Sequence, residues 1–303
     1  MLTNNVRRVG LSVAVVAALT SVAACGGSDD GGSKGGGKKE SAGRSVAKVD
    51  PIAALVAVQK KTGQAQSARV EGDTAMGSTM SMKQNGVLDW SDGITGSMKI
   101  TYTGGTMADA MKQAGGSGTM EARYFKDGYL ADMGEAMSQQ TGGKRWISYS
   151  YDDLEKMAGA SGAALKDQMQ NSTPEQGVKS LLASGDVKKV GQEDVRGVST
   201  THYAGTVDVA ALTAKNSSLS ADELDAFKKQ LADAGITTES VDIWVDDNDL
   251  LVKKTERGQM KTGELNSTVY YSDYGTKVSV ERPPADQTVD FMELMKQQQG
   301  AAS

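Results

Sequence analysis

The chain has 303 residues, 38% of them hydrophobic, and a formal net charge of −5 at pH 7. This acidic balance, without a long block of Lys and Arg, gives no electrostatic reason to bind nucleic acid, and we exclude that class of partner. The single cysteine, Cys25, and the single histidine, His202, exclude an internal disulfide and a zinc site with several His or Cys ligands. We expect neither a metal nor a cofactor.

The first 24 residues have the pattern of a lipoprotein signal peptide. Arg7 and Arg8 precede an apolar run, Val9 to Leu19, and small residues then lead directly to Cys25. The apolar run is too short to span a bilayer, which takes roughly 20 residues. We therefore expect residues 1–24 to be removed and Cys25 to carry a diacylglycerol. That anchor would hold the protein on the outer face of the cell membrane.

Residues 25–49 are predicted to form a disordered tether. Gly, Ser and Lys dominate this stretch, and its few apolar side chains cannot offset the entropy of ordering it. A flexible segment of this length would hold a folded domain away from the lipid headgroups. We expect the folded domain over residues 50–291 and a C-terminal tail over 292–303 that is compatible with a short helix.

Capping residues predict three helices in the folded domain. Asp50 and Pro51 begin the first, which ends near Gly63. A capping box with a proline begins the second over residues 173–185, and another capping box begins the third over residues 220–235.

Between these helices the apolar side chains recur at every second residue, which is typical of strands with one wet face. Turn residues at 126–128 and 246–249 each separate two such strands as a tight hairpin. Strands are expected over 97–103, 120–124, 147–151, 240–256, 262–274 and 277–281. The predicted fold class is α+β: a large, curved, antiparallel sheet of about ten or eleven strands with helices packed on its concave face.

Two features suggest chemistry, and each has a simpler explanation. The acidic residues Asp246 to Asp249 lack the ligand spacing of a calcium loop, so we expect a plain turn. His202 has no companion His or Cys, and the chain has no Gly-x-Ser-x-Gly motif that would supply a nucleophile. Strand alternation predicts a solvated position for His202. We expect no catalytic residues and no enzymatic activity.

Several segments together resemble a known lipoprotein family. In chain order they are Ala53 to Thr62, Ser67 to Gly72, Val195 to Asp208, Ile243 to Asp247, Tyr271 to Gly275 and Val278 to Pro284. This order resembles the LppX/LprG family of actinobacterial lipoproteins, which is similar in fold to the LolA/LolB lipoprotein carriers. The resemblance covers about residues 50–291. It implies a half-barrel whose concave face, partly covered by helices, holds the acyl chains of lipids or lipoglycans without catalysis.

Methionine enrichment between Met76 and Met137 fits a groove that adapts to variable apolar ligands, although ordinary core packing also explains it. Two functions remain open: binding of a lipid or glycolipid for carriage or presentation, and a surface interaction or sensing module with a filled core and a protein partner. The oligomeric state is left open. The candidate groove residues are Met76, Met98, Ile100, Tyr102, Met120, Tyr124, Ile147 and Tyr149.

Overall fold

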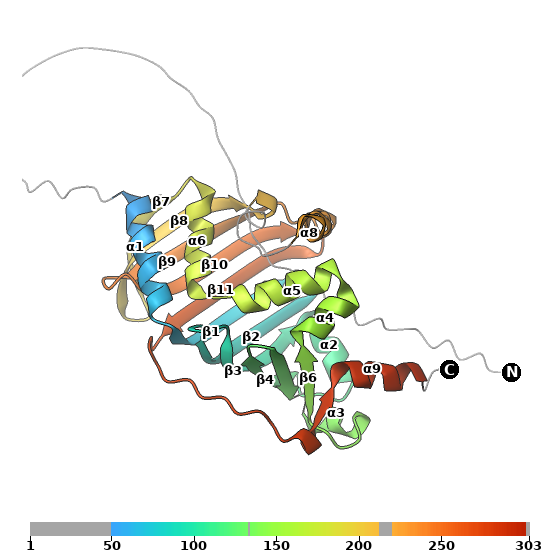
Figure 1. Ribbon diagram of the computed structural model, residues 1–303. Helices are drawn as coiled ribbons and strands as arrows, with labels where there is room; N and C mark the ends of the chain where they lie inside the picture. The colour runs from blue at the N-terminus through green and yellow to red at the C-terminus, as the bar shows by residue number, and fades with distance from the viewer. Residues whose placement is uncertain (1–49, 133, 212–219, 301–303) are drawn as a thin grey trace, which may run out of the picture.

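The computed structural model describes residues 50–132, 134–211 and 220–300 (Figure 1). The predictions for residues 1–49, which include the signal peptide, Cys25 and the tether, lie outside the described residues. Among the helices of the described part, none is long and apolar enough to cross a membrane.

The described residues form one twelve-stranded sheet with the strand order β12-β6-β5-β4-β3-β2-β1-β11-β10-β9-β8-β7. Neighbouring strands are antiparallel, except that β12 runs parallel to β6. Two meanders, β1 to β6 and β7 to β11, are joined where β1 pairs with β11. The strands are β1 Ser67–Met76, β2 Met80–Asp89, β3 Thr95–Gly104, β4 Thr119–Phe125, β5 Gly128–Asp132, β6 Trp146–Ser150, β7 Lys188–Val195, β8 Val198–Asp208, β9 Thr238–Asp246, β10 Leu251–Met260, β11 Gly263–Ser272 and β12 Thr288–Asp290.

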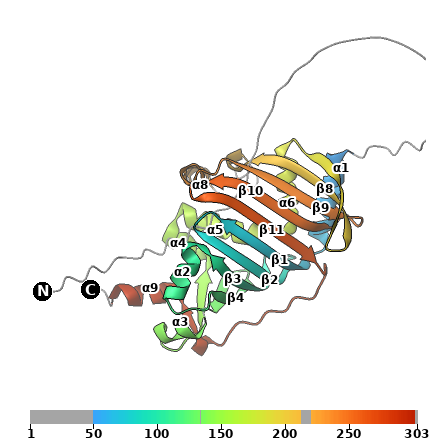
Figure 2. The ribbon, with the colours of Figure 1, turned by 180° about the vertical axis from the view of Figure 1, so that it is seen from behind.

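Helices cover one face of this sheet. In Figure 1, α1, α6, α5 and α4 cross in front of the strands. In Figure 2, the central strands are seen from behind with no helix across them. The fold is therefore an α+β fold with a curved sheet, as the sequence predicts. The helices are α1 Pro51–Gln64, α2 Gly105–Gln113, α3 Glu135–Gln140, α4 Tyr151–Ala158, α5 Ala160–Asn171, α6 Pro174–Ser184, α8 Ala221–Ala234 and α9 Phe291–Gly300, with a short 3-10 turn at Ala285–Gln287.

Two of the three predicted helix caps are confirmed by their hydrogen bonds. The Asp50 side chain accepts from the amide of Ile52 at 3.0 Å, and the Thr173 side chain accepts from the amide of Gln176 at 3.4 Å. Helix α6 ends at Gly185, whose φ of 77° favours glycine. These helices form where local sequence satisfies their first free amides, which is why the sequence predicted them.

Helices α2 to α5 were not predicted from the sequence. Helices α2 and α3 begin after Gly104 and Gly134, neither of which supplies a capping side chain. Helix α4 did carry a signal, because Ser150 accepts a hydrogen bond from the amide of Asp153 and acidic residues fill the first turn. Its position directly after β6 masked that signal.

The strand predicted over 277–281 is wrong. This segment has no strand pairing, and it runs along the lower edge of the molecule in Figure 1 to reach β12. Both edges of β11 are already paired, with β1 and β10, so the segment that follows β11 has no free edge beside that strand. Side chains hold the segment instead: an Arg123 Nη atom donates to the carbonyl of Glu281 at 2.9 Å, and Arg282 pairs with Asp127.

The sheet has twelve strands where about ten or eleven were expected. Strand β12 contributes to the difference because three residues are too few to show alternation. Strand β2 was also missed, since its side chains are half-buried over much of its length and give no clear alternation.

Candidate functional site

The strand register places the groove candidates on the face that carries the helices. Ile243 belongs to the core cluster packed with α1 and α6, and its cross-strand partner is Lys254. Together they begin a row of directly paired residues that runs across the sheet, from Lys254 to Val269 and then to Gly72. From Gly72 the row continues through Gln84 and Ile100, and it ends at Met120. Because directly paired residues project to the same face, Ile100 and Met120 share the face of Ile243.

A second row places the candidates of β6 on the same face. Val70 pairs with Gly86, and Gly86 pairs with Met98. The row continues through Ala122 and Ala131 to Ile147. We name this continuous surface of β1 to β6, with the adjoining part of β11, the inner face.

The structure brings some groove candidates together and separates others. Met98 and Ile100 are buried in one cluster, with Tyr102, Met120 and Tyr124 packed against it. Ile147 lies in another cluster with Val289 and Leu294, against which Tyr149 packs. Met76 is buried but belongs to neither cluster. Residues of the first cluster that the sequence reasoning missed are Val70, Met82, Leu88, Ala122, Val269 and Tyr271.

Tyrosines link the two apolar clusters. The rings of Tyr129 and Tyr149 stack with centroids 4.6 Å apart and an interplanar angle of 9°. The ring centroids of Tyr124 and Tyr151 lie 6.1 and 6.4 Å from that of Tyr129. The ring of Tyr149 also packs on Phe291 of α9 at 4.8 Å. Each ring offers an apolar face and one polar group, a combination suited to the boundary between an apolar groove and water.

Burial keeps these phenols neutral. It raises the pKa of Tyr149 to about 12, and it raises the pKa of Tyr151 to about 12 with a further contribution from the charge of Asp127. Burial also raises the pKa of Tyr129 well above its ordinary value. At physiological pH the phenols therefore act as neutral hydrogen-bonding groups.

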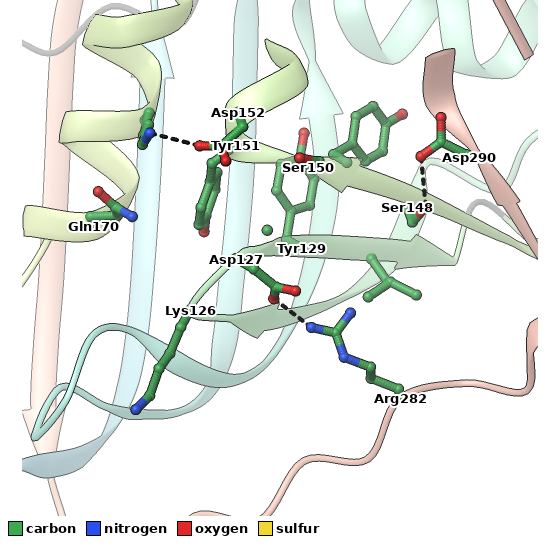
Figure 3. Close-up of a pocket in the computed structure, with 14 residues that line it drawn as sticks. Lys126, Asp127, Tyr129, Ser148, Ser150, Tyr151, Asp152, Gln170, Arg282 and Asp290 are labelled. Atoms are coloured by element: carbon green, nitrogen blue, oxygen red, sulfur yellow. Dashed lines mark hydrogen bonds and ion pairs between the residues drawn. The ribbon is translucent and has the colours of Figure 1, made fainter. Parts of the chain in front are cut away.

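A cavity of about 360 Å³ opens at these tyrosines. Figure 3 shows Tyr129 and Tyr151 lining it, with Lys126, Asp127 and Arg282 at its lower side. Arg282 pairs with Asp127, Lys126 pairs with Asp92, and Lys166 donates to Asp152 at 2.8 Å. The Asp290 carboxylate accepts a hydrogen bond from the Ser148 hydroxyl at 3.4 Å. The Tyr151 hydroxyl is buried and has no hydrogen-bond partner among the described residues. The volume lies in the range of small-ligand sites, but Tyr149 is the one groove candidate among its lining residues.

A polar strip on β10 and β9 adjoins the apolar clusters. Lys254 donates to Glu256 at 2.7 Å, and their side chains are 17% and 15% exposed. Burial lowers the pKa of Lys254, but Glu256, Tyr271 and Glu239 together outweigh this effect and raise that pKa above its ordinary value. Glu239 is 1% exposed, and neither of its carboxyl oxygens has a hydrogen-bond partner among the described residues. Burial, reinforced by the charge of Glu256, raises the pKa of Glu239 well above its usual range.

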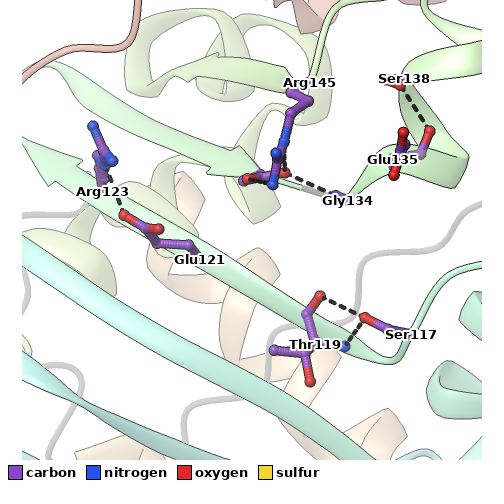
Figure 4. Close-up of polar contacts among 9 residues, drawn as sticks. Ser117, Thr119, Glu121, Arg123, Gly134, Glu135, Ser138 and Arg145 are labelled. Atoms are coloured by element: carbon purple, nitrogen blue, oxygen red, sulfur yellow. Dashed lines mark hydrogen bonds and ion pairs between the residues drawn. The ribbon is translucent and has the colours of Figure 1, made fainter.

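The opposite face of the sheet carries ion pairs. Arg123 donates to Glu121 at 2.8 Å along β4, and Arg145 donates to both oxygens of Asp132, at 2.7 and 3.2 Å. Figure 4 shows these pairs, together with the contact of Thr119 and Ser117. The two faces therefore differ in chemistry, as the strand alternation predicts.

The prediction that His202 is solvated is wrong. Its side chain is 15% exposed, and its ring stacks on Trp244 with centroids 4.3 Å apart. His202 lies on the face of the sheet away from the helices, and its direct cross-strand neighbour is Trp244, whose ring covers the imidazole. Its Nε2 lies 2.7 Å from Asp242, and its Nδ1 lies 3.2 Å from Glu193.

The predicted plain turn at 246–249 is confirmed. The Asp246 side chain accepts hydrogen bonds from the amides of Asn248 and Leu250, at 2.9 and 2.8 Å, so it closes the turn. Within the described ranges, no group of three or more His, Cys, Asp and Glu side chains is arranged to hold a metal ion.

Sequence relatives of the chain are found in Streptomyces. It is 69% identical over 252 residues to a Streptomyces griseus protein named "Uncharacterized 31.2 kDa protein in rplA-rplJ intergenic region", which covers 83% of each chain. It is 46% identical over 304 residues to the Streptomyces coelicolor protein named "Putative lipoprotein SCO4650", which covers 96% of this chain and 97% of the relative. The chain belongs to the same family as these two proteins. No family model matches it.

Two solved structures are similar to the chain at low sequence identity. LprF from Mycobacterium bovis matches with a TM-score of 0.47 and 13% sequence identity, and the match covers 78% of this chain and 97% of the LprF chain. The lipoprotein LppX from Mycobacterium tuberculosis matches with a TM-score of 0.42 and 14% sequence identity, and the match covers 75% of this chain and 98% of the LppX chain. The S. coelicolor relative carries a lipoprotein name, as the resemblance of the sequence implies.

Proposed function

We propose that the protein is an extracytoplasmic lipoprotein, anchored to the membrane through a diacylglycerol on Cys25, that binds the acyl chains of a lipid or glycolipid on its inner face. Its role is carriage or presentation of that lipid in the cell envelope. No covalent step is part of the proposal.

The observation that supports it best is the continuity of the inner face. Direct strand pairing connects Met98 to Ile147, and the stacked pair of Tyr129 and Tyr149 bridges the apolar clusters on either side. Apolar burial is non-directional, so such a surface accepts chains of different structure. The lipoprotein name of the relative in S. coelicolor supports the anchored location.

A second function, an interaction module with a filled core, is favoured by one observation. Met98 and Ile100 are only 4% and 7% exposed. A lipid on the inner face therefore has to displace side chains that are already packed together. Methionine can be displaced in this way because its flexible side chain repacks around a ligand at low cost.

Native mass spectrometry of the protein purified from its own host tests the proposal. Carriage predicts a bound lipid that survives purification. Ile100→Lys should lower the bound fraction, whereas Lys99→Ala, on the opposite face of the same strand, should not. A folded Ile100→Lys protein with unchanged lipid, or a wild-type protein with none, contradicts lipid carriage and favours the interaction module.

A further inference from the structure

Helix α1 presents a second apolar surface, on its side away from the sheet. Leu55 and Val58 are buried in the core against α6 and the strands. Ile52 and Val56 point outward instead and are 39% and 52% exposed. Residues four apart are neighbours on a helix surface, so these two side chains form one patch. Two further exposed residues of α1, Ala53 and Ala57, are also apolar.

The charges of α1 differ from those of the protein as a whole. The helix has the sequence PIAALVAVQKKTGQ, which contains no acidic residue. Lys60 and Lys61 are exposed at its C-terminal end, and neither takes part in an ion pair with another described residue. An exposed apolar stripe beside unpaired lysines is typical of helices that lie in the interface of an anionic membrane. The net negative charge of the protein opposes this contact only weakly, because physiological salt screens charges beyond about 8 Å.

The position of α1 in the chain indicates which surface it meets. Asp50, which caps α1, follows Cys25 by 25 residues, so α1 is the first described element after the proposed anchor. Once Cys25 holds the chain at a bilayer, every encounter of α1 with that bilayer is intramolecular. An effective concentration in the millimolar range is typical of short flexible linkers, so a weak interface is then sufficient.

We propose that the exposed face of α1, formed by Ile52, Val56, Lys60 and Lys61, docks on the anionic membrane surface to which the protein is anchored. Docking turns the end of the sheet that carries α1 and α6 toward the bilayer. The inference rests on the proposed anchor for its orientation, but not on lipid carriage by the inner face.

Vesicle partition of the mature chain tests the docking surface by itself. The chain from residue 25 onward carries Cys25→Ser, so that no acyl anchor contributes, and the vesicles contain phosphatidylglycerol or phosphatidylcholine alone. We expect binding to the phosphatidylglycerol vesicles that weakens with salt. Val56→Glu should reduce the partition at least about tenfold, because it places a charge where the docked helix would bury an apolar side chain in the membrane. Replacing both lysines by alanine should reduce it about fivefold for each lysine and flatten the salt dependence.

Met157→Glu is the matched control. Met157 is 46% exposed, so the substitution adds the same charge at a comparably exposed apolar position, and it lies on α4, on the opposite side of the molecule from α1 in Figure 1. Its partition should stay within about twofold of the wild type. Equal loss in both variants, no loss in Val56→Glu, or no vesicle binding by the wild type overturns the proposal. Sedimentation that shows a dimer dissociated by Val56→Glu also overturns it, since the patch would then contact a second copy.

A folded Ile100→Lys protein separates this surface from the proposed function. Partition lost in Val56→Glu and kept in Ile100→Lys supports docking whether or not lipid is carried. Partition lost only in Ile100→Lys means that the inner face removes lipid from the vesicles, so carriage stands and docking fails.

Discussion

Replacing the buried carboxyl group of Glu239 by an amide should stabilise the protein at neutral pH. Glu239 pairs across the sheet with Val207 and Gly258, and the missing side chain of Gly258 gives it room: a Cβ there would lie 2.7 Å from the Glu239 Cγ. The carboxyl group has no hydrogen-bond partner among the described residues and lies near the negative charge of Glu256. Glu239→Gln keeps the shape of the side chain and removes the ionisable group.

The magnitude follows from the raised pKa of Glu239. The unfolded chain ionises this group near its ordinary pKa of 4.5, whereas the folded protein keeps it protonated to a much higher pH. Each pH unit between the two values costs about 1.4 kcal/mol of folding stability. The contribution of Glu239 is therefore fully present below pH 4.5 and is lost as the pH rises toward the folded pKa. At pH 7 the loss reaches about 3 kcal/mol, which Glu239→Gln should restore.

Urea unfolding followed by tryptophan fluorescence, repeated at intervals from pH 5 to pH 8, measures this effect. The gain from Glu239→Gln should be small at pH 5 and grow to about 3 kcal/mol at pH 7. Glu264→Gln, at an exposed position on β11, is the matched control and should change stability by less than about 0.5 kcal/mol at every pH. A gain that does not grow with pH, or a loss at pH 7, would show that Glu239 is ionised in the folded protein and refute the reasoning.

Further predictions concern the anchor, the sheet and the ligand. Cys25→Ala should leave an unacylated precursor in the host, detected by mass spectrometry, and normal acylation of that variant contradicts the lipoprotein assignment. Gly86→Ala should cost about 1 to 3 kcal/mol in urea unfolding, because a Cβ would lie 2.0 Å from the Ser97 carbonyl oxygen; Gly191→Ala, which meets nothing within 4 Å, should not, and equal costs contradict the packing. Removing two methylenes from a bound acyl chain should weaken calorimetric binding by about 1 to 2 kcal/mol, whereas a dependence on headgroup alone contradicts apolar recognition.

Local sequence determined the elements whose signals are contained within a few residues. The capping side chains of Asp50 and Thr173 fixed the starts of α1 and α6, because a helix must satisfy its first amides close by in the chain. Strand alternation placed Met98 and Ile100 on the inner face, since successive side chains of a strand point to opposite faces. The α+β class and the one-sided helices followed from these local features.

The tertiary structure decided how distant segments meet. The pairing of β1 with β11 joins two meanders, and it leaves no free edge beside β11 for a strand over 277–281. No local pattern shows that Trp244 lies directly opposite His202 or that Glu239 is buried without a partner. Such environments depend on register and packing across the whole sheet, whereas capping and alternation depend only on neighbours along the chain.

At the candidate site, too, some features follow from local sequence and others only from tertiary contacts. Alternation identified Tyr149, but the cavity beside it is assembled from the β4–β5 turn, β6, α4, α5 and the segment that carries Arg282. These parts are far apart in sequence, and they come together because β12 pairs with β6 and draws the C-terminal segment across the sheet edge. The sequence determined which side chains are apolar and which face they share; the long-range strand pairing determined where that face ends and what lies at its rim.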